Sequence, residues 1–365
     1  MRKDSSEPLV RISKRATIAP WKAWLIRIAA LFAALVICAV IIYAITKMNP
    51  LKVYGTMFQG AFGTSKRLWV TIRDIMMMQC IAIGLAPVFK MRFWNIGAEG
   101  QILVGGCAAA ACMIYFPNIP LGLLLALMAI SSAVAGAIWG LIPAIFKAKW
   151  NTNETLFTLM MNYVAIQLTS YCVALWENPY GSNSVGIINP VSHSGWLPSV
   201  FGQAYTLNVV IVLLLSLLMY VYLRYSKQGF EIAVVGESEN TARYAGINVG
   251  KVIIRTMAIS GAVCGIAGFL AVSGASHTIS TSTAGGKGFT AIIVAWMAKF
   301  NAWVMLLISA LIVFLERGAV EIASAYNLSN HVSEMITGII LFFLIGSEFF
   351  INYNVKFRGA ARRAE

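Results

Sequence analysis

The sequence predicts an all-α, polytopic membrane protein with about ten transmembrane helices and both termini in the cytoplasm. Hydrophobic residues make up 59% of the 365 positions and charged residues only 12%, against about 25% charged in an ordinary soluble domain. Mean hydropathy is +0.76, and a soluble fold of this size cannot hide so much apolar surface. The composition therefore excludes a cytosolic enzyme, a secreted disulfide scaffold and a disordered chain.

The first element is a basic segment, residues 1–27, which is followed by an apolar run over 28–45. A signal peptide is the alternative interpretation, but the polar lead is long and no small-x-small cleavage site follows the run. We therefore expect an uncleaved first transmembrane helix. A span needs roughly 20 apolar residues, and this rule places the others at 69–89, 98–116, 121–146, 155–176, 206–223, 252–274, 288–299, 302–320 and 333–350.

Lys and Arg gather in alternate loops, and their distribution predicts the orientation of a membrane protein. They concentrate in the N-terminal segment, in the loops after every second span and in the tail at 351–365, so these parts are expected in the cytoplasm. The expected transmembrane domain, 28–350, lies between the two basic segments. Its largest external loop, 177–205, has no Lys or Arg. On this assignment Lys287 also lies outside.

The net charge of +14 follows from these loops. No basic patch is interleaved with aromatic residues, so we expect contact with membrane lipid and not with nucleic acid. The six cysteines lie in or beside apolar runs. None forms a C-x-x-C pair or has a nearby histidine, so we interpret them as small buried residues and expect no metal site.

No catalytic or cofactor-binding motif is present. The sequence lacks G-x-S-x-G and H-E-x-x-H, and its three histidines are far apart. Gly286-Lys287 is followed by Gly288 where a phosphate-binding loop needs Ser or Thr. The same glycines match a relaxed dinucleotide pattern, but they open a membrane helix and follow no strand. We therefore expect no catalytic residue, no cofactor and no ATPase site in this chain.

Two segments carry polar residues that a plain membrane bundle does not need. In the first, Asn95, Glu99 and Gln101 lie at membrane depth or at its edge among several glycines. A carboxylate in hydrocarbon costs about 2.5–3.5 kcal/mol on insertion scales, so it must face a cavity or have a partner. Glu99 therefore either lines a translocation pathway or caps a helix start at the cytoplasmic interface.

The second segment is the internal loop 224–251, which carries charges of both signs and is patterned for a short helix. Ser238 or Asn240 can begin that helix, and Gly246 can end it. Five residues of this element are candidates for a functional role: Glu237, Glu239, Arg243, Tyr244 and Gly246. The alternative interpretation is an ordinary solvated loop.

Four stretches resemble one family. FWNIGAEGQILVGG is similar to the NIGAEGQ signature of permease subunits of ATP-binding-cassette (ABC) importers in the ribose/nucleoside, or simple sugar, family, especially its nucleoside-type branch. The other three stretches are NETLFTLMMNYVA, ENTARYAGINVGKVIIRTMAISGAVCGIAG and GGKGFTAIIVAWMAKFNAW. Trp296, Lys299 and Thr241 depart from the family's usual small or aliphatic residues, which leaves the substrate open.

The resemblance implies a permease that translocates nucleosides or related ribosides and sugars across the cell membrane. It also implies three partners: a cytoplasmic ATP-binding subunit, a second and different permease chain, and an extracytoplasmic substrate-binding lipoprotein. Glu239 to Gly246 would form the coupling helix that docks on the ATPase. Asn95, Glu99, Gln101 and Asn162 would lie near the translocation pathway.

An ion-coupled secondary transporter is the competing hypothesis. Such proteins carry acidic residues or broken helices near the middle of the membrane. Here Glu99, Asp74 and Glu348 approach the membrane only near its expected edges. A membrane enzyme is a third hypothesis, which the lack of any catalytic constellation disfavours.

Overall fold

The computed structural model describes residues 10–15, 18–47, 49–200 and 202–357. The chain divides into two compact units, Thr64–Val313 and Met1–Gly63 with Phe314–Glu365, which are described separately. Helices dominate both units, which confirms the predicted all-α class. The first nine residues of the expected basic segment, and 358–365 of the expected tail, lie outside the described residues.

The larger unit, Thr64–Val313, is a bundle of membrane helices. Its elements are α3 (Ser65–Lys90), α4 (Ala98–Tyr115), α5 (Leu121–Trp150), α6 (Glu154–Leu175), α7 (Thr206–Tyr225), α8 (Lys227–Glu237), α9 (Glu239–Tyr244), α10 (Val249–Ala271) with a π-helical turn (Val272–Ser276), α11 (Lys287–Met297) and the first half of α12 (Ala302–Ala325).

Within the described part of the chain, nine helices are long and apolar enough to cross a membrane. They match nine of the expected spans and confirm a polytopic membrane protein. The tenth expected span, 288–299, corresponds to α11, which has only 11 residues. Such a helix is about 16 Å long, roughly half of the ~30 Å hydrocarbon core.

Glycines bring α10 into direct contact with the backbones of α4 and α5. A Cβ atom at Gly265 would overlap the carbonyl oxygen of Ser132 and lie 3.2 Å from the Cα atom of Gly136. A Cβ atom at Gly105 would lie 2.5 Å from the Cα atom of Gly265. Small residues allow membrane helices to approach this closely, so these glycines determine how tightly α10 packs on α4 and α5.

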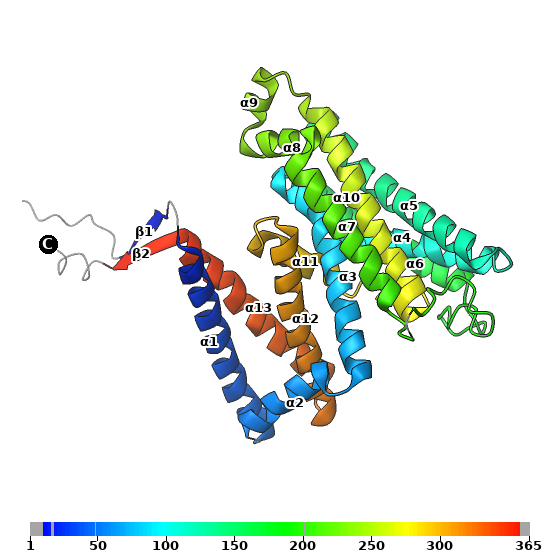
Figure 1. Cartoon of the computed structure of the whole chain (residues 1–365), viewed down its shortest axis with the longest axis horizontal. Coiled ribbons are helices and arrows are strands. Elements are labelled where there is room, and N and C mark those ends of the chain that lie inside the picture. Colours follow the sequence, from blue (N-terminus) through cyan, green and yellow to red (C-terminus); the bar gives the residue numbers. More distant parts are fainter. Residues whose placement is uncertain (1–9, 16–17, 48, 201, 358–365) are drawn as a thin grey trace, which may run out of the picture. The chain divides into compact units, whose positions relative to one another are not determined.

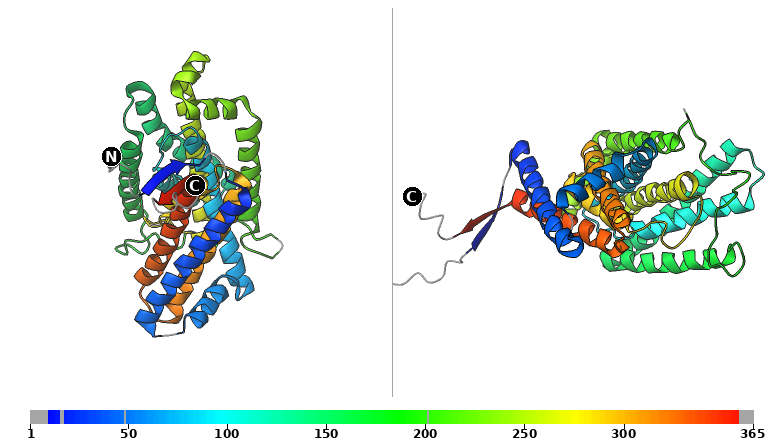
Figure 2. Two further views of the ribbon diagram at one scale, coloured as in Figure 1. Left: turned by 90° about the vertical axis from the view of Figure 1, so that its left-hand side faces the viewer. Right: turned by 90° about the horizontal axis from the view of Figure 1, so that it is seen from below.

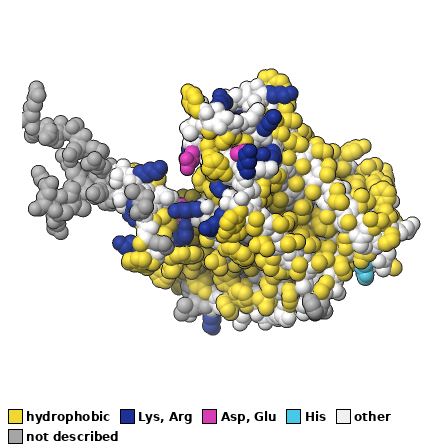
Figure 3. All heavy atoms as spheres, turned by 45° about the horizontal axis from the view of Figure 1, so that its top comes forward, with side chains coloured by type: hydrophobic (Ala, Val, Ile, Leu, Met, Phe, Trp, Pro, Cys, Tyr) yellow, Lys and Arg dark blue, Asp and Glu magenta, His cyan; other side chains and the backbone are white. Residues whose placement is uncertain are grey.

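The connecting segments of this unit lie at two ends of the bundle. Figure 1 shows α8 and α9 at one end of α7 and α10, with irregular loops at the other. Side chains attach the loop 177–205 to the adjoining helices: Asn189 Nδ2 donates to Met113 O of α4 (2.9 Å), and Ser273 Oγ of the π-helical turn donates to Gly195 O (2.5 Å). Lys and Arg side chains gather around the α8–α9 end (Figure 3), as the predicted cytoplasmic orientation of that end requires.

The smaller unit pairs α1 (Pro20–Thr46) with α13 (Asn330–Asn352), and Figure 2 shows them side by side. It also contains α2 (Pro50–Phe62). Strands β1 (Val10–Lys14) and β2 (Tyr353–Phe357) form a two-stranded antiparallel sheet. Nothing in the sequence pattern had indicated this pairing of the two ends of the chain.

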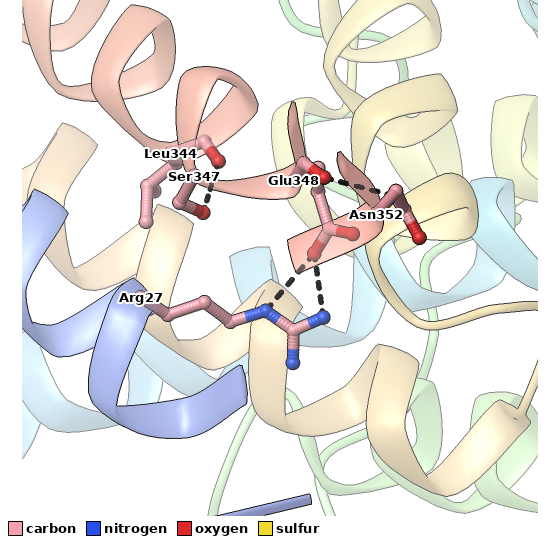
Figure 4. Close-up of polar contacts among 5 residues, drawn as sticks. All are labelled: Arg27, Leu344, Ser347, Glu348 and Asn352. Atoms are coloured by element: carbon pink, nitrogen blue, oxygen red, sulfur yellow. Dashed lines mark hydrogen bonds and ion pairs between the residues drawn. The ribbon is translucent and has the colours of Figure 1, made fainter. Parts of the chain in front are cut away.

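An ion pair joins α1 to α13. The Arg27 guanidinium donates to Glu348 Oε1 from Nε (3.0 Å) and from Nη2 (2.6 Å), as Figure 4 shows. The two side chains are 12% and 20% exposed. Helix α1 begins at Pro20, so the expected boundary between the basic segment and the membrane domain falls inside this helix.

Candidate functional site

The segment between α3 and α4 enters the bundle as irregular backbone. Asn95 is fully buried within it, and its Oδ1 atom accepts the N–H of Gly97 (2.9 Å). Gly97 is the N-cap residue of α4. A Cβ atom there would lie 3.0 Å from Asn95 Oδ1 and 3.2 Å from Thr158, so a side chain would require these neighbours to shift.

Side chains of helix α6 hold this segment through hydrogen bonds to the segment's backbone. Thr158 Oγ1 accepts the N–H of Ile96 (3.1 Å). Asn162 Oδ1 accepts the N–H of Gly100 (2.9 Å), while its Nδ2 donates to the carbonyl of Ile96 (2.9 Å). Asn162 is 3% exposed, so its amide fixes the start of α4. A pathway role for Asn162 remains a prediction.

Gln101 points toward α5 and not toward an open surface. It is 1% exposed, and its Nε2 atom lies 3.1 Å from where a Cβ atom of Gly140 would be. Its Oε1 atom has no hydrogen-bond partner among the described residues. Gln101 therefore contributes polar packing between α4 and α5 here, and its expected place on a pathway stays untested.

Glu99 joins α4 to the start of α11. Its Oε1 accepts the N–H of Gly286 (2.6 Å) and its Oε2 accepts the N–H of Gly288 (2.9 Å). These amides belong to the first turn of a helix, where four N–H groups lack a partner and the helix dipole favours a negative charge. Of the two expected roles, the structure shows the cap: Glu99 caps α11 from a position in the first turn of α4.

The close approach of Glu99 explains the glycine at 288. A Cβ atom at Gly288 would lie 2.6 Å from Glu99 Oε2 and 2.8 Å from the Glu99 backbone nitrogen. Any other residue at position 288 would push α11 away from α4. The carboxylate of Glu99 and this glycine, which are 189 residues apart in the sequence, therefore form one joint between α4 and α11.

The stretch 277–286 leads to this joint without helical structure. At its N-terminal end, His277 O accepts the N–H of Ile188 (2.8 Å) among the irregular loops. At its C-terminal end, Gly286 lies against the first turn of α4, about four helical turns from that helix's end at Tyr115. The expected external position of Lys287 is therefore wrong, because a half-helix and an irregular segment replace a full span.

Aromatic side chains lie between this segment and the α8–α9 end. Trp94 stacks on Trp296 of α11, with 5.5 Å between ring centroids, and both contact Phe89 edge to face. Trp94 and Trp296 are each more than a third exposed. Trp296, which departs from the family's usual residue, thus completes an aromatic cluster with the residue preceding Asn95.

The internal loop forms two short helices, α8 and α9, with side-chain caps. Ser226 Oγ accepts the N–H of Gly229 at the start of α8 (2.9 Å), and Ser238 Oγ accepts that of Thr241 at the start of α9 (3.2 Å). Ser238 therefore caps the start of α9; it is one of the two residues, Ser238 and Asn240, that were expected to begin this helix. Gly246 follows α9 with φ +77°, a conformation that glycine adopts freely, so the expected end is also confirmed.

Helix α8 is fixed to the bundle, whereas α9 projects from it. Arg255 of α10 pairs with Glu231 of α8 (2.9 Å), and a Cβ atom at Gly236 would overlap the carbonyl oxygen of Lys90 at the end of α3. In α9 only Ala242 is buried. The expected coupling residues are exposed: Glu237, Glu239, Arg243, Tyr244 and Gly246. Tyr244 is 93% exposed.

A polar cavity of about 390 Å³ lies beside α9. Lys147 and Lys149 from the end of α5 line it together with Glu239 and Arg243. Glu239 and Arg243 lie 3.6 Å apart and are both more than half exposed, so their mutual attraction is small. Lys147 is paired with Glu154 (2.9 Å), whereas Lys149, Glu239 and Arg243 can face a protein bound at this end.

Comparison with known proteins identifies the chain. Residues 69–345 match the family described as "Branched-chain amino acid transport system / permease component". The chain belongs to this permease family. The permease is a multi-pass protein of the cell membrane and a transport subunit of the ABC type. Permeases of this kind work with ATP-binding and substrate-binding partners. No solved structure matches the permease.

Several curated relatives cover most of the permease. The guanosine ABC transporter permease protein NupP of Bacillus subtilis is 31% identical over 301 residues, 80% of this chain and 85% of the relative. The glucose ABC transporter permease protein TsgB13 of Haloferax volcanii is 28% identical, covering 95% and 93%. The nucleoside ABC transporter permease protein NupB of Lactococcus lactis is 26% identical, covering 81% and 84%.

The structure adds three residues to the site that the sequence reasoning did not assign: Thr158, Gly286 and Gly288. The glycine-rich turn before α11 had been noticed as an irregularity and as part of the family resemblance. A second signal was the polar run Ser280-Thr281-Ser282-Thr283, which is unusual beside a membrane span. Neither signal names Glu99 as the partner, because that contact is made only by folding.

Proposed function

We propose that the permease imports nucleosides or related ribosides and sugars along a pathway bordered by residues 280–290. Its relatives are named for guanosine, glucose and nucleosides, which are polar, uncharged solutes of similar size. A substrate-binding lipoprotein would deliver the solute from outside. The family description names branched-chain amino acids, but the named relatives and the NIGAEGQ signature favour the nucleoside and sugar class.

The observation that carries this proposal is irregular, polar backbone within a membrane bundle. Thr281, Ser282 and the glycines 285 and 286 are exposed, although they lie between the level of the irregular loops and the first turn of α4. Backbone without helical bonds is tolerated at membrane depth only where protein buries it or where it borders water. Exposed hydroxyl and peptide groups here would replace part of a solute's hydration shell.

Glu99 supports an uncharged substrate. Half-helix N-termini in transporters offer N–H groups and a positive dipole to anionic substrates. In this permease, the carboxylate of Glu99 already accepts two of those N–H groups. An anionic solute would meet a negative charge in place of free donors, so nucleotides and sugar phosphates should be rejected.

A series of helix contacts would connect the loop 224–251 to the proposed pathway. Helix α9 would dock on a cytoplasmic ATP-binding subunit, and α8 is fixed to α10 by the Arg255–Glu231 pair. Helix α10 packs on α4 at Gly105 and Gly265, and α4 holds α11 through Glu99. A rigid-body movement of α9 and α8 would thus reach the half-helix through packed helices, as interfaces of this kind transmit motion.

A second, different permease chain would complete the pathway. The exposed polar stretch 281–286 needs a protein-enclosed, hydrated surrounding, and the described part of this chain does not cover it. A paired permease placed across this face would enclose the solute. In this proposal, the basic segments lie in the cytoplasm and residues 28–350 form the transmembrane domain. The loop 224–251 would couple this domain to the ATP-binding subunit.

Uptake measurements test the substrate and the energy source. Cells with and without this gene would be given radiolabelled nucleosides, pentoses and hexoses, together with nucleoside monophosphates as anionic controls. We expect uptake of an uncharged solute that is lost in the deletion strain and upon ATP depletion with the proton gradient maintained. Uptake that survives ATP depletion but collapses with the ion gradient would establish the secondary transporter instead.

Charge reversal in α9 tests the coupling role. Arg243→Glu should reduce transport at least tenfold and weaken capture of the ATP-binding subunit, because it changes an exposed cation on the projecting helix. Gly246→Pro should act in the same direction by removing the φ of +77°. Lys66→Glu, an equal reversal at the opposite end of α3, is the matched control. Unchanged capture and transport in both α9 variants would reject the coupling assignment.

A further inference from the structure

A groove of about 200 Å³ lies where α3, α7 and the turn before α12 meet, at the α8–α9 end of the larger unit. Its rim carries three cations, Lys90, Arg224 and Lys299. Its wall is apolar and includes Ile83 and Met305. This combination belongs neither to the pathway nor to the projecting helix α9.

Two of the three cations, Lys90 and Arg224, are held by neighbouring groups, but none of the three is neutralised. Lys90 Nζ donates one hydrogen bond to the carbonyl of Leu223 (3.2 Å), which leaves two of its three donors. Arg224 Nη1 donates to Tyr220 Oη (2.9 Å), and its guanidinium lies 5.8 Å from the Tyr220 ring centroid. Within the described part of the chain, none of the three has a carboxylate within ion-pair distance.

Other cations at the same end have carboxylate partners. Lys147 pairs with Glu154 (2.9 Å), and Arg255 pairs with Glu231 (2.9 Å). The fold therefore provides counter-charges at this end but places none in the groove. Three cations of one sign around a small concave site create a positive potential that an anion can relieve.

The groove lies at the depth of a lipid headgroup. Lys90 ends the apolar helix α3 and Arg224 lies in the last turn of α7, so both mark the level at which the spans leave hydrocarbon. Basic pockets between transmembrane helices on the cytoplasmic side bind anionic headgroups. The apolar wall formed by Ile83, Ala86 and Met305 offers a surface to an acyl chain, from which a free phosphate ion would gain nothing.

We propose that this groove binds an anionic phospholipid, with its phosphate among Lys90, Arg224 and Lys299 and an acyl chain along the apolar wall. Bound lipid would tie α7 to α3 and to the turn before α12. The turn places Lys299 and Phe300 at φ +48° and +62°, a conformation that non-glycine residues adopt at a cost. A ligand that contacts Lys299 would help to hold this turn in place.

Native mass spectrometry of the purified full-length protein tests the proposal. The probes are phosphatidylglycerol, phosphatidylcholine with matched acyl chains, and inorganic phosphate as competitor. We expect phosphatidylglycerol to bind at least tenfold more tightly than phosphatidylcholine. In Arg224→Gln/Lys299→Gln that preference should fall at least fivefold, while millimolar phosphate should displace little lipid.

The matched control is Lys149→Gln/Lys251→Gln, which removes two cations at the same end but outside the groove. An equal loss in the control would show general surface attraction and overturn the proposal. If inorganic phosphate displaced bound phosphatidylglycerol as efficiently as added lipid does, the groove would be a free-phosphate site and the proposal would be overturned. Photoactivatable phosphatidylglycerol on the unmodified protein should label peptides from α3, α7 and 299–305, and labelling confined to other helices would also overturn it.

Discussion

Replacing Glu99 by Gln would test whether its carboxylate holds α11 in place. The two oxygens accept N–H groups of Gly286 and Gly288 at 2.6 and 2.9 Å. In Gln, an NH₂ donor faces one of these N–H groups, so one bond is lost. A hydrogen bond to a charged group contributes about 1.5–3 kcal/mol, and a charge at a helix N-terminus about 0.3–1 kcal/mol.

The attachment of α11 should therefore weaken by about 2–4 kcal/mol. At 1.4 kcal/mol per factor of ten, this shifts the ratio of attached to detached α11 by roughly 30- to 700-fold. Hydrogen–deuterium exchange of a peptide covering 284–290 measures this ratio, because the amides that Glu99 accepts are protected only while α11 is attached. Solute uptake with the partner subunits present should fall at least tenfold.

The control is Glu177→Gln in the irregular loops. Glu177 also accepts two backbone N–H groups, from Gly181 (2.9 Å) and Asn183 (3.2 Å), but it does so in an exposed turn. Water replaces such bonds, so uptake and exchange at 284–290 should not change. If Glu99→Gln left both quantities within twofold of the unmodified protein at equal expression, the joint between α4 and α11 would have no functional role.

Three further changes probe the packing, the ion pair and the loop histidine. Gly265→Val should destabilise the protein by about 1–3 kcal/mol through overpacking against Ser132, seen as a lower melting temperature. Arg27→Met should cost about 1–3 kcal/mol by leaving partly buried Glu348 without this partner, and Arg27→Met/Glu348→Met should recover most of it. Burial, with His193 and Arg73 nearby, holds the pKa of His277 below 6.5. As pH falls through 6.5, the unfolded chain therefore binds a proton at His277 more readily than the folded protein does. The melting temperature should decline between pH 7.5 and 5.5, and the decline should be smaller in His277→Gln.

The sequence by itself determined the membrane class, nine of the ten expected spans and the position of the two segments rich in polar residues. A membrane helix satisfies all its backbone hydrogen bonds internally, so its apolar run is a local signal that needs no partner. The same locality explains why Ser238 and Gly246 were predicted as the limits of α9, since a cap involves residues only three or four positions apart. NIGAEGQ distinguished the segment that holds the start of α11, because several polar residues and glycines are rare together at membrane depth.

Only the tertiary structure decided what those polar residues contact. Asn162 was expected near a pathway, yet its amide bonds the backbone at Ile96 and Gly100. The span expected at 288–299 is a half-helix, since the polar stretch before it descends along α4. Glu99 and Gly286 are 187 residues apart, and Arg27 and Glu348 are 321 apart. Bonds over such separations form only when packed helices bring the groups together, so no pattern along the chain records them.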